Sequence, residues 1–168
     1  MGWDFKHGAT KQDTINELIK GYDGEKQNRV CIMHSVRGNV LWTVWSIINK
    51  TTHETTWLIG CDLLSSQKNY GWGYKSMSED MHPYYYTCPL KYLDIVPVAC
   101  QEWRDKVIKL AKERAVLSKK TFSLGEIIKL KGCKIPEVTV LSVKPLIGES
   151  SDGRKYKIPK RMIDMETV

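Results

Sequence analysis

Apolar positions near the start of the chain recur first at helical spacing and then at strand spacing. Residues 13–20 place Ile15, Leu18 and Ile19 on one side and are followed by Gly21, a pattern that predicts a short helix. Three strand-like runs come next, separated by short polar turns: residues 29–36, 40–48 and 55–64. Because short connections join neighbouring antiparallel strands, these runs predict an antiparallel meander, and its middle run is apolar on both faces, as in a central strand.

Helical spacing returns in the middle of the chain. Residues 89–95 begin with a proline, which is favoured at the first position of a helix, and they predict a short helix. Residues 101–117 give the clearest helical pattern, with an apolar face that includes Trp103 and Val107. Lysines and an arginine occupy the opposite face.

The last fifty residues return to strand patterns after an apparent linker at residues 118–120. Strands are predicted at residues 124–130, 138–143 and 155–158, with a last short strand near Met162. The segment 148–153 is rich in Gly, Ser and Asp, which indicates a hairpin tip. Several short strands in so few residues predict an SH3-like or partly open β-barrel. We therefore expect an α+β fold with an α+β domain at residues 1–118 and a small barrel at residues 121–168.

The segment from Asn69 to Pro89 has neither helical nor strand periodicity. It combines glycines, aromatic residues, acids, a histidine and two prolines, which predicts a loop of fixed shape. Its aromatic residues are typical of the centres of protein interfaces, which makes them candidates for partner binding: Trp72, Tyr74, Tyr84 and Tyr85. The alternative is that these rings pack inside the protein, where a buried tyrosine needs only one partner for its hydroxyl.

The same loop holds the weak catalytic candidates of the chain. Imidazole and carboxylate groups serve in acid–base chemistry and a thiol can act as a nucleophile, so the candidates are Glu79, Asp80, His82 and Cys88. The structural alternative is that the acids begin a turn and the histidine hydrogen-bonds the loop. No dinucleotide or P-loop motif is present, and Cys31 with His34 is only half of a zinc spacing. We therefore expect no cofactor and no metal.

The formal net charge of +7 is unevenly distributed along the 168 residues. Residues 1–99 carry 10 Lys/Arg and 10 Asp/Glu, whereas residues 100–168 carry 16 and 9. A small barrel with a basic face is a common way to hold nucleic acid through phosphate contacts. The candidates for nucleic-acid binding are Lys129, Lys131, Lys144, Arg154, Lys155, Lys157, Lys160 and Arg161. The alternative is a set of edge-strand lysines that prevent aggregation.

Four segments together resemble an uncharacterised domain family carried by bacteriophages, plasmids and other bacterial mobile elements. They are the M-G-W start, the run G-Y-K-S-M-S-E-D-M from Gly73 to Met81, the run P-Y-Y-Y-T-C-P from Pro83 to Pro89, and E-W-R at residues 102–104. The match covers roughly two-thirds of the chain. Trp72 stands where the family pattern has phenylalanine. The resemblance implies no activity, but it implies a mobile-element accessory protein in a bacterial cytoplasm.

These observations favour a binding protein over an enzyme, with three hypotheses left open. The first is an accessory protein that contacts nucleic acid or a nucleoprotein complex through the basic barrel. The second is a protein–protein inhibitor or adaptor, for example against host defence, that uses the aromatic loop. The third is an enzyme centred on His82. No apolar run approaches the roughly 20 residues of a membrane span, so we expect no membrane partner.

Overall fold

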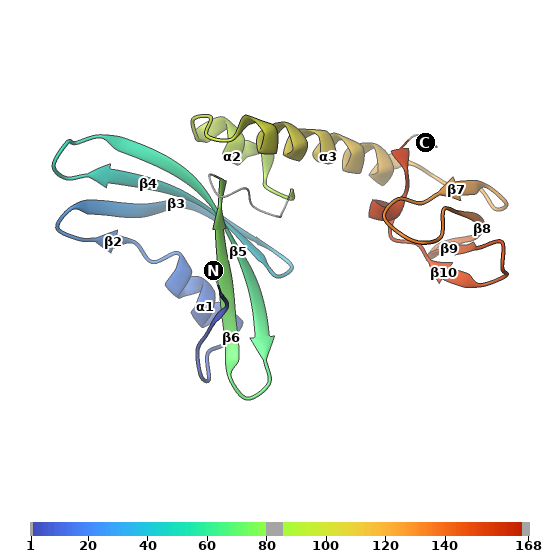
Figure 1. Ribbon diagram of the computed structural model, residues 1–168, viewed down its shortest axis with the longest axis horizontal. Coiled ribbons are helices and arrows are strands. Elements are labelled where there is room, and N and C mark those ends of the chain that lie inside the picture. The colour runs from blue at the N-terminus through green and yellow to red at the C-terminus, as the bar shows by residue number, and fades with distance from the viewer. Residues whose placement is uncertain (1, 80–85, 166–168) are drawn as a thin grey trace. The chain divides into compact units, whose positions relative to one another are not determined.

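The computed structural model describes residues 2–79 and 86–165, and the chain divides into two compact units. Unit 1 comprises Met1–Ile108 and unit 2 comprises Lys109–Val168. Each unit contains its own antiparallel sheet, and helices accompany the sheets (Figure 1). The α+β class predicted from the sequence is therefore confirmed. The boundary lies within helix α3 (Gln101–Lys119), so the segment expected to be a linker is helical in its first two residues.

Unit 1 is built on a curled six-stranded antiparallel sheet with the strand order β1-β6-β5-β4-β3-β2 (Figure 1). The strands are β1 (Asp4–Phe5), β2 (Tyr22–Asp23), β3 (Gln27–Arg37), β4 (Val40–Asn49), β5 (Thr55–Gln67) and β6 (Gly71–Ser78). Strands β3, β4 and β5 form the predicted meander. Strand β4 lies in its centre and is buried on both faces from Val40 to Val44, as the apolar pattern indicated.

The prediction of a loop from Asn69 was wrong for its first half, because residues 71–78 form strand β6. This strand pairs with β5 from Gly71 opposite Gln67 to Ser78 opposite Gly60. Its apolar side chains are distributed over both faces of the sheet, and Gly73 has no side chain to mark a face. The alternation by which a strand is recognised is therefore absent from the sequence. Residues 80–85 lie outside the described part of the chain.

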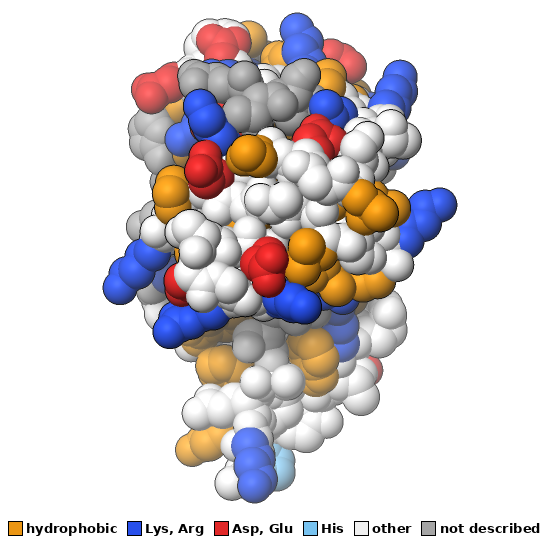
Figure 2. Space-filling model, turned by 90° about the vertical axis from the view of Figure 1, so that its right-hand side faces the viewer, with side chains coloured by type: hydrophobic (Ala, Val, Ile, Leu, Met, Phe, Trp, Pro, Cys, Tyr) orange, Lys and Arg blue, Asp and Glu red, His pale blue; other side chains and the backbone are white. Residues whose placement is uncertain are grey.

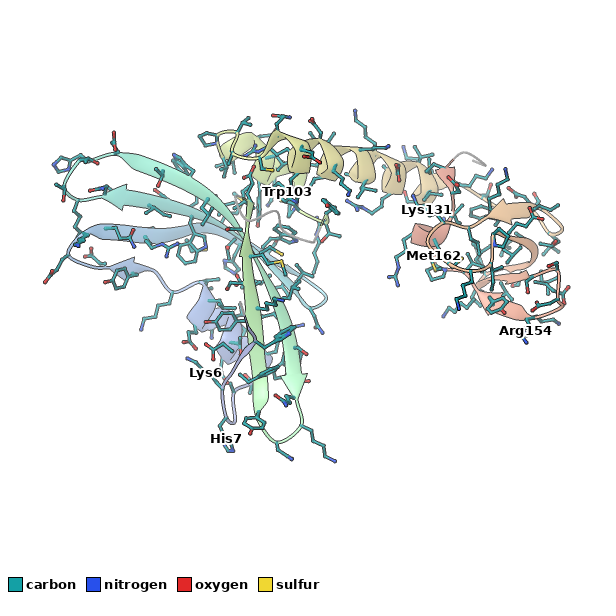
Figure 3. All side chains as sticks on the ribbon, viewed as in Figure 1. Lys6, His7, Trp103, Lys131, Arg154 and Met162 are labelled. Carbon is teal, nitrogen blue, oxygen red and sulfur yellow. The ribbon has the colours of Figure 1, made fainter. Side chains whose placement is uncertain are left out.

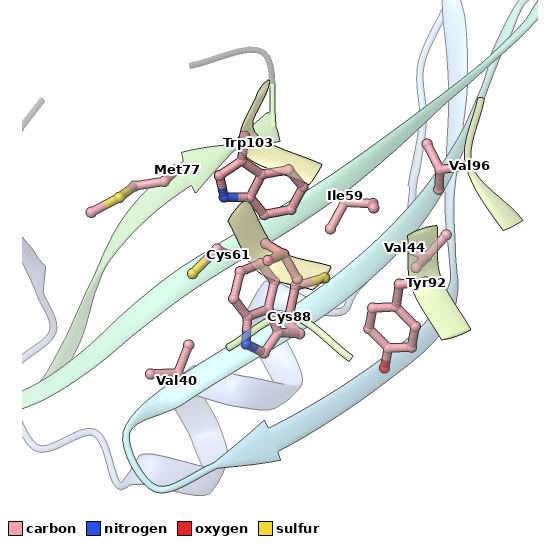
Figure 4. Close-up of a cluster of buried hydrophobic side chains, with 11 residues drawn as sticks. Val40, Val44, Ile59, Cys61, Met77, Cys88, Tyr92, Val96 and Trp103 are labelled. Atoms are coloured by element: carbon pink, nitrogen blue, oxygen red, sulfur yellow. The ribbon is translucent and has the colours of Figure 1, made fainter. Parts of the chain in front are cut away.

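Helices α2 (Leu90–Ile95) and α3 pack on one face of this sheet. Trp42 and Val44 from β4 and Cys61 from β5 meet Tyr92 of α2 and Trp103 of α3 (Figure 4). The indole rings of Trp42 and Trp103 lie 6.2 Å apart between centroids. Full burial of side chains of this size stabilises a fold by about 1.5–3 kcal/mol each, so this cluster is the principal core of unit 1.

Helix α1 (Lys11–Leu18) covers part of the opposite face. Thr10 caps it by accepting a hydrogen bond from the Asp13 amide, and the helix begins at Lys11, two residues before the predicted start. Ile15 packs against Leu41 and Leu64 of the sheet. The Lys11 ammonium group donates hydrogen bonds to Gly38 and Asn39 in the β3–β4 turn, at 2.7 and 2.9 Å. These contacts attach α1 to the sheet near one end of β4.

Unit 2 contains a four-stranded sheet with the order β10-β9-β8-β7. Its strands are β7 (Ile127–Lys129), β8 (Glu137–Val143), β9 (Leu146–Glu149) and β10 (Lys155–Lys157). Ile128, Val138, Val140 and Leu146 form its core with Leu117 of α3. The sequence pattern missed β9. The expected strand near Met162 is instead the short helix η2 (Lys160–Met162), because Pro159 precedes it and the chain then turns to bridge Leu130 with Ile163.

A substitution at Gly73 tests whether the close approach of β1 to β6 requires a residue without a side chain. A Cβ atom on Gly73 would lie 2.2 Å from the Asp4 carbonyl oxygen and 2.7 Å from the Phe5 Cα atom. We predict that Gly73→Ala lowers the free energy of unfolding by about 1–3 kcal/mol, because β1 must move away from β6. Urea unfolding measures this change. Gly2→Ala, which meets no atom within 4 Å, is the control, and equal stabilities of the two variants would contradict the prediction.

Candidate functional site

The catalytic candidate Glu79 lies in a buried ion pair. Its side chain follows the end of β6, is 1% exposed and contacts Arg104 of α3, which is 4% exposed. Arg104 donates from Nε to one carboxylate oxygen and from Nη2 to the other. The guanidinium group also donates to the carbonyl oxygens of Leu93, Val96 and Pro97, at 2.8–3.0 Å. Both oxygens of Glu79 are therefore engaged in holding the α2–α3 connection against the sheet.

The thiol candidate Cys88 is buried in the core beside the same helices. Its side chain is 2% exposed, and burial raises the pKa of its thiol to about 12. Only the thiolate attacks as a nucleophile, so burial disfavours a nucleophilic role for Cys88 near neutral pH. The other catalytic candidates, Asp80 and His82, lie outside the described residues. No group of three or more metal-ligating side chains occurs in the part of the chain that the structure describes.

The aromatic candidates for partner binding contribute to the packing beneath α1. Trp72 and Tyr74 of β6 are partly buried against the α1 cluster, and the Lys11 ammonium group lies 5.2 Å from the centroid of the Trp72 ring. Only part of the surface of each ring is therefore accessible to a binding partner. Tyr84 and Tyr85 lie outside the described residues. The neighbouring Tyr86 packs against the principal core, with the Lys106 ammonium group 4.4 Å from its ring centroid.

Lys160, one of the eight basic candidates, caps a helix. Its ammonium group donates to the carbonyl oxygens of Leu117, Ser118 and Lys120 at 2.8–3.3 Å. The Leu117 and Ser118 carbonyls belong to the end of α3, and the Lys120 carbonyl follows it directly. The last carbonyl groups of a helix have no partner within the helix. A cation at a helix C-terminus also interacts favourably with the helix dipole. Lys160 therefore stabilises unit 2 in addition to any contact with a ligand.

Two further basic candidates form ion pairs within unit 2. Lys131 contacts Glu113 of α3 at 3.1 Å, and Arg154 contacts Asp152 in the β9–β10 turn at 3.4 Å. The two side chains lie at separate places in the unit (Figure 3). Exposed ion pairs of this kind are worth only about 0–1 kcal/mol. Either cation can consequently leave its carboxylate for a phosphate at little cost.

The other five candidates are all exposed. In the sheet register Lys129 stands opposite Glu137, and Lys155 stands opposite Glu149. None of the five forms an ion pair among the described residues: Lys129, Lys144, Lys155, Lys157 and Arg161. On the face of the molecule that Figure 2 shows, Lys and Arg side chains are separated by acidic and hydrophobic ones. The basic charge there is distributed rather than gathered in one patch.

The backbone joins several of these basic residues. The Lys131 amide donates to the Met162 carbonyl oxygen at 2.8 Å, and the Asp164 amide donates to the Lys129 carbonyl oxygen at 2.9 Å. Helix η2, which carries Lys160 and Arg161, is therefore bonded to the segment of Lys129 and Lys131. These four residues form the basic cluster of unit 2. The sequence could not predict this grouping, because it depends on the bridge between Leu130 and Ile163, which lie far apart in the chain.

Asp62 is a buried carboxyl group that the sequence did not single out. It lies on β5 opposite Leu41 and Ser76, is 7% exposed and accepts a hydrogen bond from the Ser76 hydroxyl. No basic side chain pairs with it among the described residues. Burial raises its pKa to about 6, partly offset by the hydrogen bond from Ser76. Asp62 therefore titrates closer to neutrality than an ordinary aspartate.

Comparisons of the chain with protein-family models, curated proteins and solved structures found no match. In the described parts of the chain, no helix has the length and apolar character that crossing a membrane requires.

Removal of the Arg104 side chain tests the structural role of Glu79. We predict that Arg104→Leu lowers the free energy of unfolding by about 3–5 kcal/mol, because it leaves a buried carboxylate and three carbonyl oxygens without their donor. Chemical denaturation measures the change. Lys109→Leu, which replaces an exposed cation on the same helix, should alter stability by less than about 0.5 kcal/mol. Similar losses in both variants would contradict a role specific to Arg104.

Asp62 gives the stability of unit 1 a dependence on pH. The folded-state pKa of about 6 lies above the ordinary 3.8, so the folded protein holds the proton more tightly than the unfolded chain. Stability from this group is present at low pH and falls as pH rises through about 4 to 6. Asp62→Asn should therefore raise the free energy of unfolding above pH 6 by roughly 1–3 kcal/mol, with little effect near pH 4. Urea titrations at both pH values test this, and destabilisation at neutral pH would refute it.

Proposed function

We propose that this chain is a non-enzymatic accessory protein of a phage or mobile element that binds nucleic acid, or a nucleoprotein complex, through unit 2. The observation that carries the proposal is the distribution of charge. Unit 2 contains 14 Lys/Arg and 7 Asp/Glu, whereas residues 1–108 contain 12 of each. The full excess of +7 therefore belongs to 60 residues. Phosphate contacts by Lys and Arg supply affinity without sequence recognition, which suits a distributed basic surface.

Two parts of unit 2 support the proposal most directly. One is the basic cluster around η2, where Arg161 forms no ion pair among the described residues and Lys131 has only an exposed one. The other is the end of the sheet near Lys144 and Pro145. There Lys157 stands opposite Ile147, which follows Pro145 by two residues. We expect unit 2 to form a small SH3-like or partly open barrel that presents both groups of basic side chains on its surface. The bacterial setting comes from the sequence resemblance and is part of the proposal.

The structure guides the choice of variants. Lys160 should be left unchanged, because its loss would also remove the cap of α3 and confuse binding with folding. Lys144, Lys157 and Arg161 are exposed and form no ion pair among the described residues, so a triple change to Gln removes charge with little effect on the fold. A matched control removes the same charge from unit 1 at three exposed lysines: Lys20, Lys26 and Lys68.

The test is binding of labelled mixed-sequence duplex DNA and single-stranded RNA across a salt series. We expect affinity to fall steeply with salt, and the slope of log K against log salt to decrease by about 0.9 on duplex DNA, or about 0.7 on single strands, for each removed side chain that contacts a phosphate. The unit 1 control should keep the slope of the natural chain. Absence of binding at low salt, or equal slopes for both triple variants, would overturn the proposal.

A further inference from the structure

One edge of the sheet in unit 1 is open over most of its length. Strand β3 pairs with β4 from Gln27 to Arg37. On its other side it pairs with β2 only at Asn28 and Arg29. In the described chain, the segment from Val30 to Arg37, which we call the β3 edge, therefore has no strand on the side opposite β4. Its outward backbone amide and carbonyl groups form a template to which another extended chain can add.

The β3 edge differs from the other sheet edges among the described residues. Strands β1 and β2 contain two residues each, and β7 and β10 contain three. Strand β6 is also open beyond β1, but only from Lys75 to Ser78, and this run begins with a lysine. Strand β10 also carries Lys155 and Lys157, and lysine on an edge discourages unwanted pairing. The β3 edge has neither protection: it is eight residues long and contains no lysine or proline. The register with β4 shifts between Cys31 and Met33, which leaves Met33–Arg37 as a regular run.

Apolar side chains are exposed along this edge. Val30 is 43% exposed, Ile32 is 44% and Val36 is 40%. An apolar strand edge of this length is a liability for a protein that must remain free, because it invites pairing with other chains. The combination of open backbone groups and exposed apolar side chains is what an added strand uses: the backbone supplies affinity and the side chains supply selectivity.

Charge indicates which extended chain fits. Strand β3 carries Arg29 and Arg37 and has no Asp or Glu. The Lys11 ammonium group lies at the turn that follows, bonded to the Gly38 carbonyl oxygen. A second copy of this chain would bring a strand of the same positive sign to the edge. A strand with apolar side chains and carboxylates is complementary to it.

We propose that the β3 edge binds an extended acidic segment of another protein by β-strand addition, with apolar side chains of the segment beside Val36 and a carboxylate near Arg37. The backbone groups of Met33–Arg37 hold the added strand, and the positive charge at the β3–β4 turn selects an acidic one. This surface lies in unit 1. It does not depend on the nucleic-acid binding proposed for unit 2.

The probe is a short fluorescent peptide in which valine and threonine alternate, with aspartate at both ends. Fluorescence anisotropy with the full chain should detect its binding. The same peptide with N-methylated backbone amides should bind at least about tenfold more weakly, because it cannot complete the strand hydrogen bonds. A version with lysine in place of aspartate should also bind more weakly. Equal binding of the N-methylated peptide, or no binding of the aspartate peptide, would overturn the proposal.

Two variants locate the site. Val36→Lys places a charge on the edge and should weaken binding of the aspartate peptide about tenfold, whereas Val98→Lys, at a valine 66% exposed elsewhere in unit 1, should leave it unchanged. Arg37→Glu should weaken the aspartate peptide and strengthen the lysine peptide. Circular dichroism establishes that each variant is folded. Unchanged binding by both edge variants would refute the site, and a dimer in sedimentation that Val36→Lys disperses would assign the edge to a second copy instead.

Discussion

The fold of unit 1 depends on the guanidinium group of Arg104. It satisfies both oxygens of Glu79 at the end of β6 and three carbonyl oxygens in and after α2. The Glu79 carboxylate is buried, and leaving it without the guanidinium group would be costly in a low-dielectric interior. One side chain therefore fixes the place where the sheet ends, where α2 stops and where α3 begins. The hydrophobic cluster around Trp42 and Trp103 packs over a geometry that this polar contact determines.

The sequence predicted the parts of this fold whose patterns are local. The helix of Trp103 and Val107 and the meander of β3 to β5 follow from periodicity and turn residues. In unit 2 the turn residues indicated a hairpin tip, but β9, one of the two strands of that hairpin, was missed. Strand β6 was missed because both of its faces are covered and one of its positions is a glycine. The role of Glu79 was missed because its partner lies 25 residues away, and a carboxyl group near a histidine resembles an acid–base pair in sequence.

The candidate basic site could be predicted in composition but not in arrangement. The excess of lysine and arginine is evident from the sequence, and so is its confinement to the second part of the chain. Tertiary contacts decide which of these cations are free to bind a ligand. Lys160 binds the end of α3, and Lys131 and Arg154 have carboxylate partners. Arg161 has no ion pair among the described residues. Similarly, the sequence predicted β3 as a strand, but only the short length of β2 reveals that one side of it is open.

The position of the unit boundary inside α3 limits how the two units can be separated. Residues 118–120 resemble a linker, yet a cut there would leave Leu117 behind and remove one wall of the hydrophobic core of unit 2. It would also remove two of the three carbonyl oxygens that Lys160 binds. The last turns of α3 therefore belong to the small unit as fully as its strands do. A fragment of unit 2, or a domain exchange, that keeps this packing intact should begin near Lys109, about two and a half helical turns before residue 118.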